Sequence, residues 1–322
     1  MERIDKALGR FGPWMGYLAA FILGAVLLVA AFAKGLDPAL FAEGLSKLGF
    51  VPQSLTTYAA LGAVAFEAAL GLALVLNIRT KPVLAITLLT FVFFTAVVIR
   101  EMYLPKSEQS SCGCFGTLVE RTPRQALIED LIFVVLSLVA FVGRRAPVAG
   151  APAPRWHLPA IGFGAAAGLA FCLASPHLPL DNLATRLKPG ISIETVKVGD
   201  QALDNQFPEA QVGRHLILLL DRARDDEATK QAMERVNRIL VNVDTVATHV
   251  WGLAEANEEL AGQFFWVAAP AFEIRSVPLA LLRPMYRTLP RAALIVDRQV
   301  IKVWNEIPDE ATLQALARGE NP

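Results

Sequence analysis

The chain has 322 residues, of which 54% are hydrophobic and 19% are charged, and its formal net charge is zero at neutral pH. Soluble domains are nearer one quarter charged, so this composition favours a membrane protein. A neutral chain gives no reason to expect a nucleic-acid partner. The three cysteines, Cys112, Cys114 and Cys172, are too few for a disulfide scaffold and leave redox or metal chemistry open.

Five apolar runs are long enough to cross a bilayer, because a helix needs about 20 residues to span ~30 Å of hydrocarbon. We expect spanning helices at Phe11–Ala33, Leu55–Leu76, Pro82–Ile99, Ala126–Val142 and His157–Ser175. The first run is longer than the apolar part of a signal peptide, so we expect it to be retained. Between the first two runs, Phe41, Leu45 and Leu48 recur at helical spacing and predict a short amphipathic helix.

Basic residues gather in alternate loops, as expected if successive spans reverse direction. They are Arg3, Lys6 and Arg10, then Arg79 and Lys81, then Arg144, Arg145 and Arg155. Because Lys and Arg prefer the cytoplasmic side, we expect a multi-pass inner-membrane protein with a cytoplasmic N-terminus. Cys112, Cys114 and the region after the fifth span would then lie in the periplasm.

Glu67 is a carboxylate inside the second run, where a charge is costly and is expected to face the bundle interior. Ala63 and Gly71 share its helical face, so a neighbouring helix can approach closely there. Glu67 either bonds between helices or handles protons. Glu129 and Asp130, near the start of the fourth run, either mark the water boundary or serve as an acid or base, and Asp130 could favour the helix N-terminus.

The region after Ser175 has the composition of a soluble domain. Strands are expected at His215–Leu220, His249–Leu253, Arg291–Asp297 and Val300–Glu306. Helices are expected at Glu227–Leu240, Asn257–Phe265, Pro278–Met285 and Asp309–Ala317, the last with Asp309 as its cap. This order looks like the α/β thioredoxin-like fold over residues 191–318, and Thr288-Leu289-Pro290 resembles the cis-proline loop of that fold.

Thioredoxins carry Cys-X-X-Cys after the first central strand, whereas this chain has Asp221-Arg222-Ala223-Arg224-Asp225-Asp226 there. Without sulfur, the domain cannot exchange disulfides by itself. A groove beside Thr288 and Pro290 would bind an extended client chain. Alternatively, the domain only covers the outer face of the bundle.

The Cys112-Gly113-Cys114 segment can close only a small, strained ring, which predicts a labile disulfide instead of a structural one. A structural pair and a pair of metal ligands are the alternatives, although two cysteines are an incomplete zinc set, and we expect no metal. Cys172, in the fifth run, is either a small buried hydrophobe or a thiol that resolves a disulfide with Cys112 or Cys114.

Three elements together resemble the methylamine-utilisation MauE family, within the DoxX-like four-helix membrane proteins, over about residues 14–143. They are Ala33-Lys34-Gly35-Leu36-Asp37-Pro38, Glu67 with Gly71, and Cys112-Gly113-Cys114-Phe115-Gly116. The resemblance implies a membrane partner in periplasmic disulfide formation, whose client in the type case is the small subunit of methylamine dehydrogenase. Members also occur where no methylamine oxidation is expected, so the client does not carry over.

The sequence thus predicts a four-helix domain at 1–145, a fifth spanning helix and linker at 146–190, and a periplasmic thioredoxin-like domain at 191–322. The expected function is thiol–disulfide maturation of exported proteins, with an exported client or a periplasmic thioredoxin-like protein as partner. One alternative is a non-enzymatic scaffold or assembly factor whose outer domain docks a client. The other is a DoxX-like subunit of a quinone oxidoreductase, with a quinone as cofactor.

Overall fold

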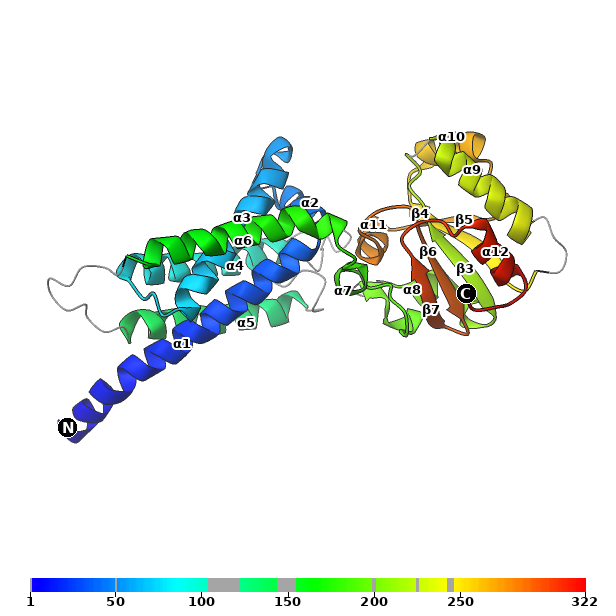
Figure 1. The fold of residues 1–322 in the computed structure, drawn as a ribbon. Helices are drawn as coiled ribbons and strands as arrows, with labels where there is room; N and C mark the ends of the chain where they lie inside the picture. The colour runs from blue at the N-terminus through cyan, green and yellow to red at the C-terminus, as the bar shows by residue number, and fades with distance from the viewer. Residues whose placement is uncertain are drawn as a thin grey trace. The chain divides into compact units, whose positions relative to one another are not determined.

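The architecture is seen in a computed structural model, shown in Figure 1. It describes residues 2–49, 51–103, 122–143, 155–198, 201–223, 226–241 and 246–322. The chain divides into two compact units, Met1–Leu180 and Asp181–Pro322, each of which is described by itself.

The first unit is helical. Its helices are α1 (Glu2–Leu36), α2 (Pro38–Leu48), α3 (Thr56–Val75), α4 (Lys81–Met102), α5 (Pro123–Val142) and α6 (His157–Ala174), with short 3₁₀ turns at Gln53–Leu55 and Ser175–His177. In the described residues, five helices are long and apolar enough to cross a membrane, which confirms the five predicted runs. The chain is therefore a multi-pass membrane protein.

Close backbone contact joins the spanning helices. Gly24 of α1 and Gly71 of α3 face each other so closely that a Cβ added at Gly71 would lie 2.9 Å from the carbonyl oxygen of Gly24. Gly164 and Gly168 of α6 meet the α3 backbone near Ala68 in the same way. Small residues allow this approach between helices in lipid, so the predicted close contact on the Gly71 face is confirmed.

The fourth spanning helix differs from the sequence-based expectation at its start. α5 begins at Pro123, because Thr122 and Gln125 form a reciprocal capping box that satisfies the first backbone N–H groups. Asp130 is therefore well inside the helix and only 2% exposed. Its expected place at the helix N-terminus was wrong, and its place at the water boundary stays a prediction.

α2 confirms the short amphipathic helix between the first two spans. Asp37 caps it, with its side chain accepting a hydrogen bond of 3.0 Å from the Leu40 backbone N–H, and Pro38 occupies the first helical position. The helix ends at Gly49, whose φ of +72° is a left-handed conformation that glycine adopts without a steric penalty.

The second unit is built around a five-stranded mixed sheet in the order β5-β4-β3-β6-β7. The strands are β3 (Arg214–Leu219), β4 (His249–Glu255), β5 (Ile274–Val277), β6 (Arg291–Val296) and β7 (Gln299–Trp304). β3, β4 and β5 are parallel, whereas β6 is antiparallel to β3 and β7 is antiparallel to β6. A separate hairpin joins β1 (Lys197–Val198) to β2 (Gln201–Ala202).

Helices cover both faces of this sheet, so its central strand is buried on both sides. One face packs against α9 (Glu227–Val236), α10 (Glu258–Ala268) and α12 (Glu310–Ala317), with Leu216 and Leu218 of β3 pointing toward them. The opposite face, with Ile217 and Leu219, is covered by shorter segments. These are α7 (Asp181–Ala184), α8 (Leu203–Gln206) and α11 (Leu279–Leu282), with 3₁₀ turns at Ile193–Thr195, Pro208–Gln211 and Arg283–Met285.

The four predicted strands are confirmed, and so is the Asp309 cap, which accepts a hydrogen bond from the Thr312 N–H at 2.9 Å. The edge strand β5 was not predicted. The helix expected over Glu227–Leu240 is α-helical only to Val236 and continues as a π-helical segment, Asn237–Val241. The peptide bond between Leu289 and Pro290 is cis, as the resemblance to a cis-proline loop implied.

Candidate functional site

A buried ion pair lies in the helical unit. The Lys34 ammonium group, in the last turn of α1, donates a hydrogen bond to Oε1 of Glu67 in α3. The two side chains are only 5% and 2% exposed. Burial of either charge alone would be very costly, so each of them makes the position of the other tolerable. Sequence reasoning placed Glu67 toward the bundle interior but did not identify Lys34 as its partner.

Two aromatic rings complete the surroundings of this pair. The Lys34 ammonium group lies 4.8 Å from the centre of the Phe94 ring in α4 and 5.2 Å from that of Phe41 in α2. Both distances suit cation–π attraction. Oε2 of Glu67 is buried and has no hydrogen-bond partner among the described residues. The site thus joins four helices around one cation and one carboxylate.

Cys172 lies in the same neighbourhood. It is 2% exposed and packs in an apolar cluster with Ala31, Val64 and Ala68, against which Phe41 also packs. Its Sγ is close to the backbone of Gly35, the residue that follows Lys34. These contacts are those of a small buried hydrophobe.

Cys112 and Cys114 lie outside the described residues, as does the Cys112–Gly116 string that carried part of the family resemblance. The described helices nevertheless fix their place in the chain order. α4 ends at Met102 and α5 begins at Pro123, so both cysteines belong to the connection between these two spans. A disulfide between Cys172 and either of them stays a prediction.

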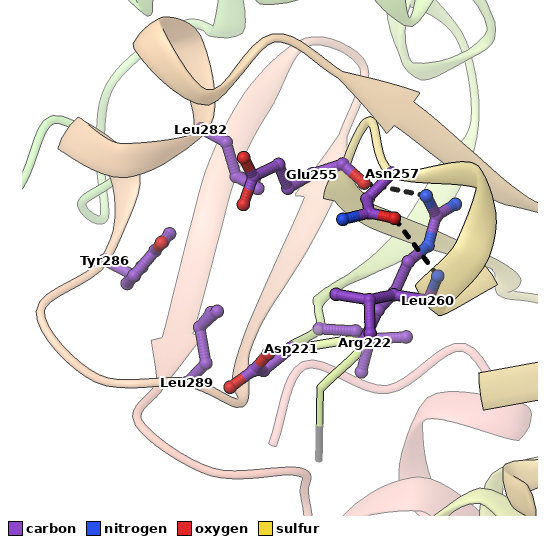
Figure 2. A pocket seen from close by; sticks show the side chains of 9 residues that line it. Asp221, Arg222, Glu255, Asn257, Leu260, Leu282, Tyr286 and Leu289 are labelled. Carbon is purple, nitrogen blue, oxygen red and sulfur yellow. Dashed lines mark hydrogen bonds between the residues drawn. The ribbon is translucent and has the colours of Figure 1, made fainter. Parts of the chain in front are cut away.

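The C-terminal unit holds a cavity of about 250 Å³ where β3 and β4 end. Its lining combines apolar and polar side chains (Figure 2), which come from several segments around the sheet edge. They are Leu220, Asp221, Arg222, Glu255, Asn257, Leu260, Leu282, Tyr286 and Leu289. Leu289 is the residue between the predicted client-binding residues Thr288 and Pro290, and neither of these two lines the cavity itself.

Arg222 fixes the floor of this cavity. Its Nη1 donates to the backbone oxygen of Glu255 at 2.7 Å and to the Ser276 hydroxyl at 3.1 Å, so it ties the end of β3 to β4 and β5. Burial lowers the pKa of the Arg222 guanidinium from its ordinary value. The sequence-based interpretation treated this stretch as a thioredoxin motif without its sulfur and did not expect a tethering arginine.

Two carboxylates face the cavity. Figure 2 shows the carboxylate of Glu255 directed toward Leu282 and that of Asp221 directed toward Leu289. Asp221 accepts a hydrogen bond of 2.9 Å from the Ala223 N–H, which holds the turn after β3. Within the described part of the chain, neither carboxylate forms an ion pair.

Arg291, the residue after the cis proline, is a second functional candidate that sequence reasoning missed. It is 1% exposed, and its Nη1 donates to Oγ1 of Thr185 at 2.6 Å and to the Met285 carbonyl at 2.5 Å. Burial lowers the pKa of its guanidinium to about 10, and the charge of Asp181 opposes this shift in part. The bond to Met285 joins the two ends of the loop that contains Leu289, and the bond to Thr185 ties this loop to the residue after α7.

No group of three or more His, Cys, Asp or Glu side chains that could hold a metal ion occurs in the portion of the chain that the structure describes.

Comparison with known proteins adds two findings. Residues 12–143 match the family described as Methylamine utilisation protein MauE, which confirms that part of the resemblance. The chain is also 26% identical over 148 residues to Protein TlpB of Flavobacterium psychrophilum, a match that covers 44% of this chain and 38% of TlpB. The chain therefore spans well under half the length of that relative. No solved structure matches it.

Proposed function

From the premise that residues 12–143 form a MauE family domain, we propose that this membrane protein supports thiol–disulfide maturation of exported proteins. Cys112 and Cys114 form the exchanging pair, and the C-terminal unit docks the client. The observation that carries the proposal is that the matched family segment contains both cysteines, one residue apart.

The chemistry of the pair supports an exchanging role. A thiolate of one cysteine attacks a client disulfide, and a mixed disulfide forms while the client releases one sulfur as thiolate. The second cysteine then displaces the client, so the pair becomes oxidised as the client disulfide is reduced; the reverse sequence oxidises the client. A disulfide across a single intervening residue is strained, and such bonds exchange readily.

The alternation of the spans supports placing these groups together. If all five helices cross the membrane in alternation, the connection between α4 and α5 would lie on the same side as the unit that follows α6. The basic residues of the remaining loops then lie in the cytoplasm. A solvated Lys34 in a periplasmic loop would count against this orientation. Lys34 is instead buried in its ion pair with Glu67.

We propose a thioredoxin-like fold for the C-terminal unit on three features. The strand order and directions, the cis peptide before β6 and the helices on both faces agree with it. All three cysteines of the chain lie in the first unit, so this fold serves here as a docking module. The cavity beside Leu289 is where the client would bind, and Thr288 and Pro290 flank Leu289 in the chain.

We assign Glu67 and Lys34 the role of holding α1, α2, α3 and α4 in one arrangement around a neutralised pair. A proton-handling role for Glu67 makes a different prediction. The Glu67→Gln variant, which keeps the shape of the side chain, would then stop thiol exchange while the protein remained folded.

Thiol trapping in cells tests the function. In a Cys172→Ser background, the Cys112→Ser or the Cys114→Ser variant is expected to accumulate a mixed disulfide with an exported protein, visible on a non-reducing gel. The variant that lacks all three thiols is the control and should show none.

A non-enzymatic scaffold is the competing function, and the absence of cysteine from the C-terminal unit favours it. It predicts no mixed disulfide with either single variant, and maturation of the client that survives the loss of Cys112 and Cys114. That pair of results would replace the redox proposal with the scaffold.

A further inference from the structure

We propose that the cavity beside Leu289 is a subsite for a lysine or arginine side chain of an extended client segment. This inference rests on the proposed docking role of the C-terminal unit and names the chemistry that the docking site selects. Three properties of the cavity carry it: its size, its walls and its charge.

The size of the cavity suits one long side chain. Its volume is about 250 Å³, whereas sites for whole small-molecule ligands usually enclose ~300–1,000 Å³. A single protruding side chain of an extended polypeptide would fit into it.

The walls of the cavity suit an aliphatic stem. Leu220, Leu260, Leu282 and Leu289 contribute its apolar lining, from four different segments of the unit. Lysine and arginine bury their methylene groups against such surfaces while their charged ends remain polar and hydrated. The apolar lining alone would accept leucine or methionine equally well, so the selection must come from the charge.

The carboxylates of Asp221 and Glu255 supply that charge. Both face the cavity in Figure 2, and neither is neutralised by an ion pair with a described residue. Among the described lining residues, Arg222 is the one cation, and it directs Nη1 to the Glu255 backbone oxygen and to Ser276, which belongs to β5 and does not line the cavity. An incoming ammonium or guanidinium group would therefore meet two carboxylates that no described residue neutralises.

The same arrangement rejects acidic segments. A glutamate side chain in this cavity would bring a third carboxylate next to two others in a partly apolar space, where like charges repel strongly. A neutral segment would gain the apolar contacts but not the charge attraction. The expected order of preference is basic, then neutral apolar, then acidic.

The test uses the full-length protein in lipid nanodiscs and blocked, fluorescent, alanine-based peptides of seven residues. The central residue is lysine, arginine, norleucine or glutamate, and fluorescence anisotropy gives each Kd. The lysine and arginine peptides are expected to bind about tenfold more tightly than the norleucine peptide, and the glutamate peptide most weakly. Equal affinity for the lysine and norleucine peptides, or no binding of any peptide, would overturn the inference.

Matched variants locate the preference. The Asp221→Asn/Glu255→Gln protein should lose the preference for basic peptides, while the Kd of the norleucine peptide stays unchanged. The turn should be kept, because asparagine can still accept the hydrogen bond from Ala223. The single Glu255→Gln variant should lose part of the preference for basic peptides. Because Glu255 is exposed, this variant is expected to fold, and it keeps the test valid if the double variant misfolds. The control is Glu259→Gln, which removes an exposed carboxylate of α10 that does not line the cavity and should keep the full preference.

These outcomes are separate from those of thiol trapping. Retention of the preference by the Asp221→Asn/Glu255→Gln protein would overturn the subsite and leave the Cys112–Cys114 exchange untouched. A failed trapping experiment together with a preference for basic peptides would instead keep the subsite as part of a scaffold.

Discussion

The two units of this chain satisfy many of their polar side chains differently, although the Lys34–Glu67 pair also joins two helices of the first unit. In the spanning helices, hydroxyl groups bond back to their own helix: Thr87 donates to the Val83 carbonyl and Ser137 to the Phe133 carbonyl, both at 2.8 Å. In the C-terminal unit, polar side chains join distant segments, as Arg222 does between β3, β4 and β5. Lipid cannot satisfy a polar group, so a spanning helix satisfies such a group within itself or, as with Lys34 and Glu67, through a neighbouring helix.

Apolar side chains differ between the units as well. Leu89 of α4 and Phe163 of α6 are 66% and 69% exposed, as befits surfaces that face lipid. The side chains of Leu216 to Leu219 in β3 are all fully buried. In the first unit, hydrophobicity alone therefore does not separate the interior from the surface, since Leu27 is fully buried whereas Leu89 is exposed.

The largest loss of stability is expected when one partner of the buried Lys34–Glu67 pair is removed. Lys34→Met or Glu67→Met alone leaves an uncompensated charge among apolar side chains, and we expect each to cost about 3–5 kcal/mol. The Lys34→Met/Glu67→Met double variant should lose far less stability than either single variant, because neither charge then remains. Thermal unfolding of the purified protein in detergent measures all three.

The matched control for that experiment is Lys47→Met. Lys47 is an exposed lysine of α2, and its replacement should leave the melting temperature nearly unchanged. If the double variant were as unstable as the sum of the two single ones, the charges would not interact and the pair would not hold the helices together.

An intermediate loss of stability is expected when the close helix contact at Gly71 in the first unit is disturbed. In Gly71→Ala, the new methyl group would lie 2.9 Å from the Gly24 carbonyl, so we expect a loss of about 1–3 kcal/mol. Gly62→Ala is the matched change in the same helix: no atom lies within 4 Å of the added Cβ, and alanine favours the helix. The same unfolding measurement should show opposite signs, and equal losses would contradict the observed packing.

The smallest loss of stability is expected from removing the partly exposed Arg275–Glu209 ion pair of the second unit. Arg275 donates two hydrogen bonds of 2.7 Å to Glu209 and lowers the pKa of that carboxyl below its ordinary 4.5. A depressed carboxyl pKa stabilises the fold above the unfolded-state value, and the gain is lost as the pH falls through the folded-state value. Because both side chains are partly exposed, we expect Glu209→Gln to cost at most about 1 kcal/mol at pH 7.

That cost should vanish in acid. Unfolding curves of the native chain and of Glu209→Gln are expected to converge as the pH falls below about 4.5, the ordinary value. Glu259→Gln, at a carboxylate for which no ion pair is described, serves as the control. A difference that persisted undiminished at pH 3 would mean that Glu209 acts through packing and not through its charge.

The sequence was most informative where one physical signal dominates. Long apolar runs predicted the five spans, and Asp309, a favoured capping residue, predicted the start of α12. The start of α5 was also readable, because Thr122 and Gln125 have capping-box spacing, but the apolar run alone put it three residues too late. The strand β5 has only four residues, too few to show a period.

The sites were harder to predict because they depend on which helix faces which. Glu67 and Lys34 are 33 positions apart, and no local pattern pairs them. Their shared membership in the elements that resemble the MauE family was the available signal. Likewise, nothing local indicates that Arg222 ties three strands or that Asp221 and Glu255 face one cavity.

The account depends on a thiol pair that faces the same compartment as the C-terminal unit, and cysteine labelling tests this most directly. Spheroplasts carrying the Cys172→Ser protein are reduced and treated with a membrane-impermeant maleimide of high mass. We predict two labels per chain without permeabilisation, and none once Cys112 and Cys114 are also replaced by serine. Labelling that appears only after the membrane is opened would place the pair in the cytoplasm and contradict the account.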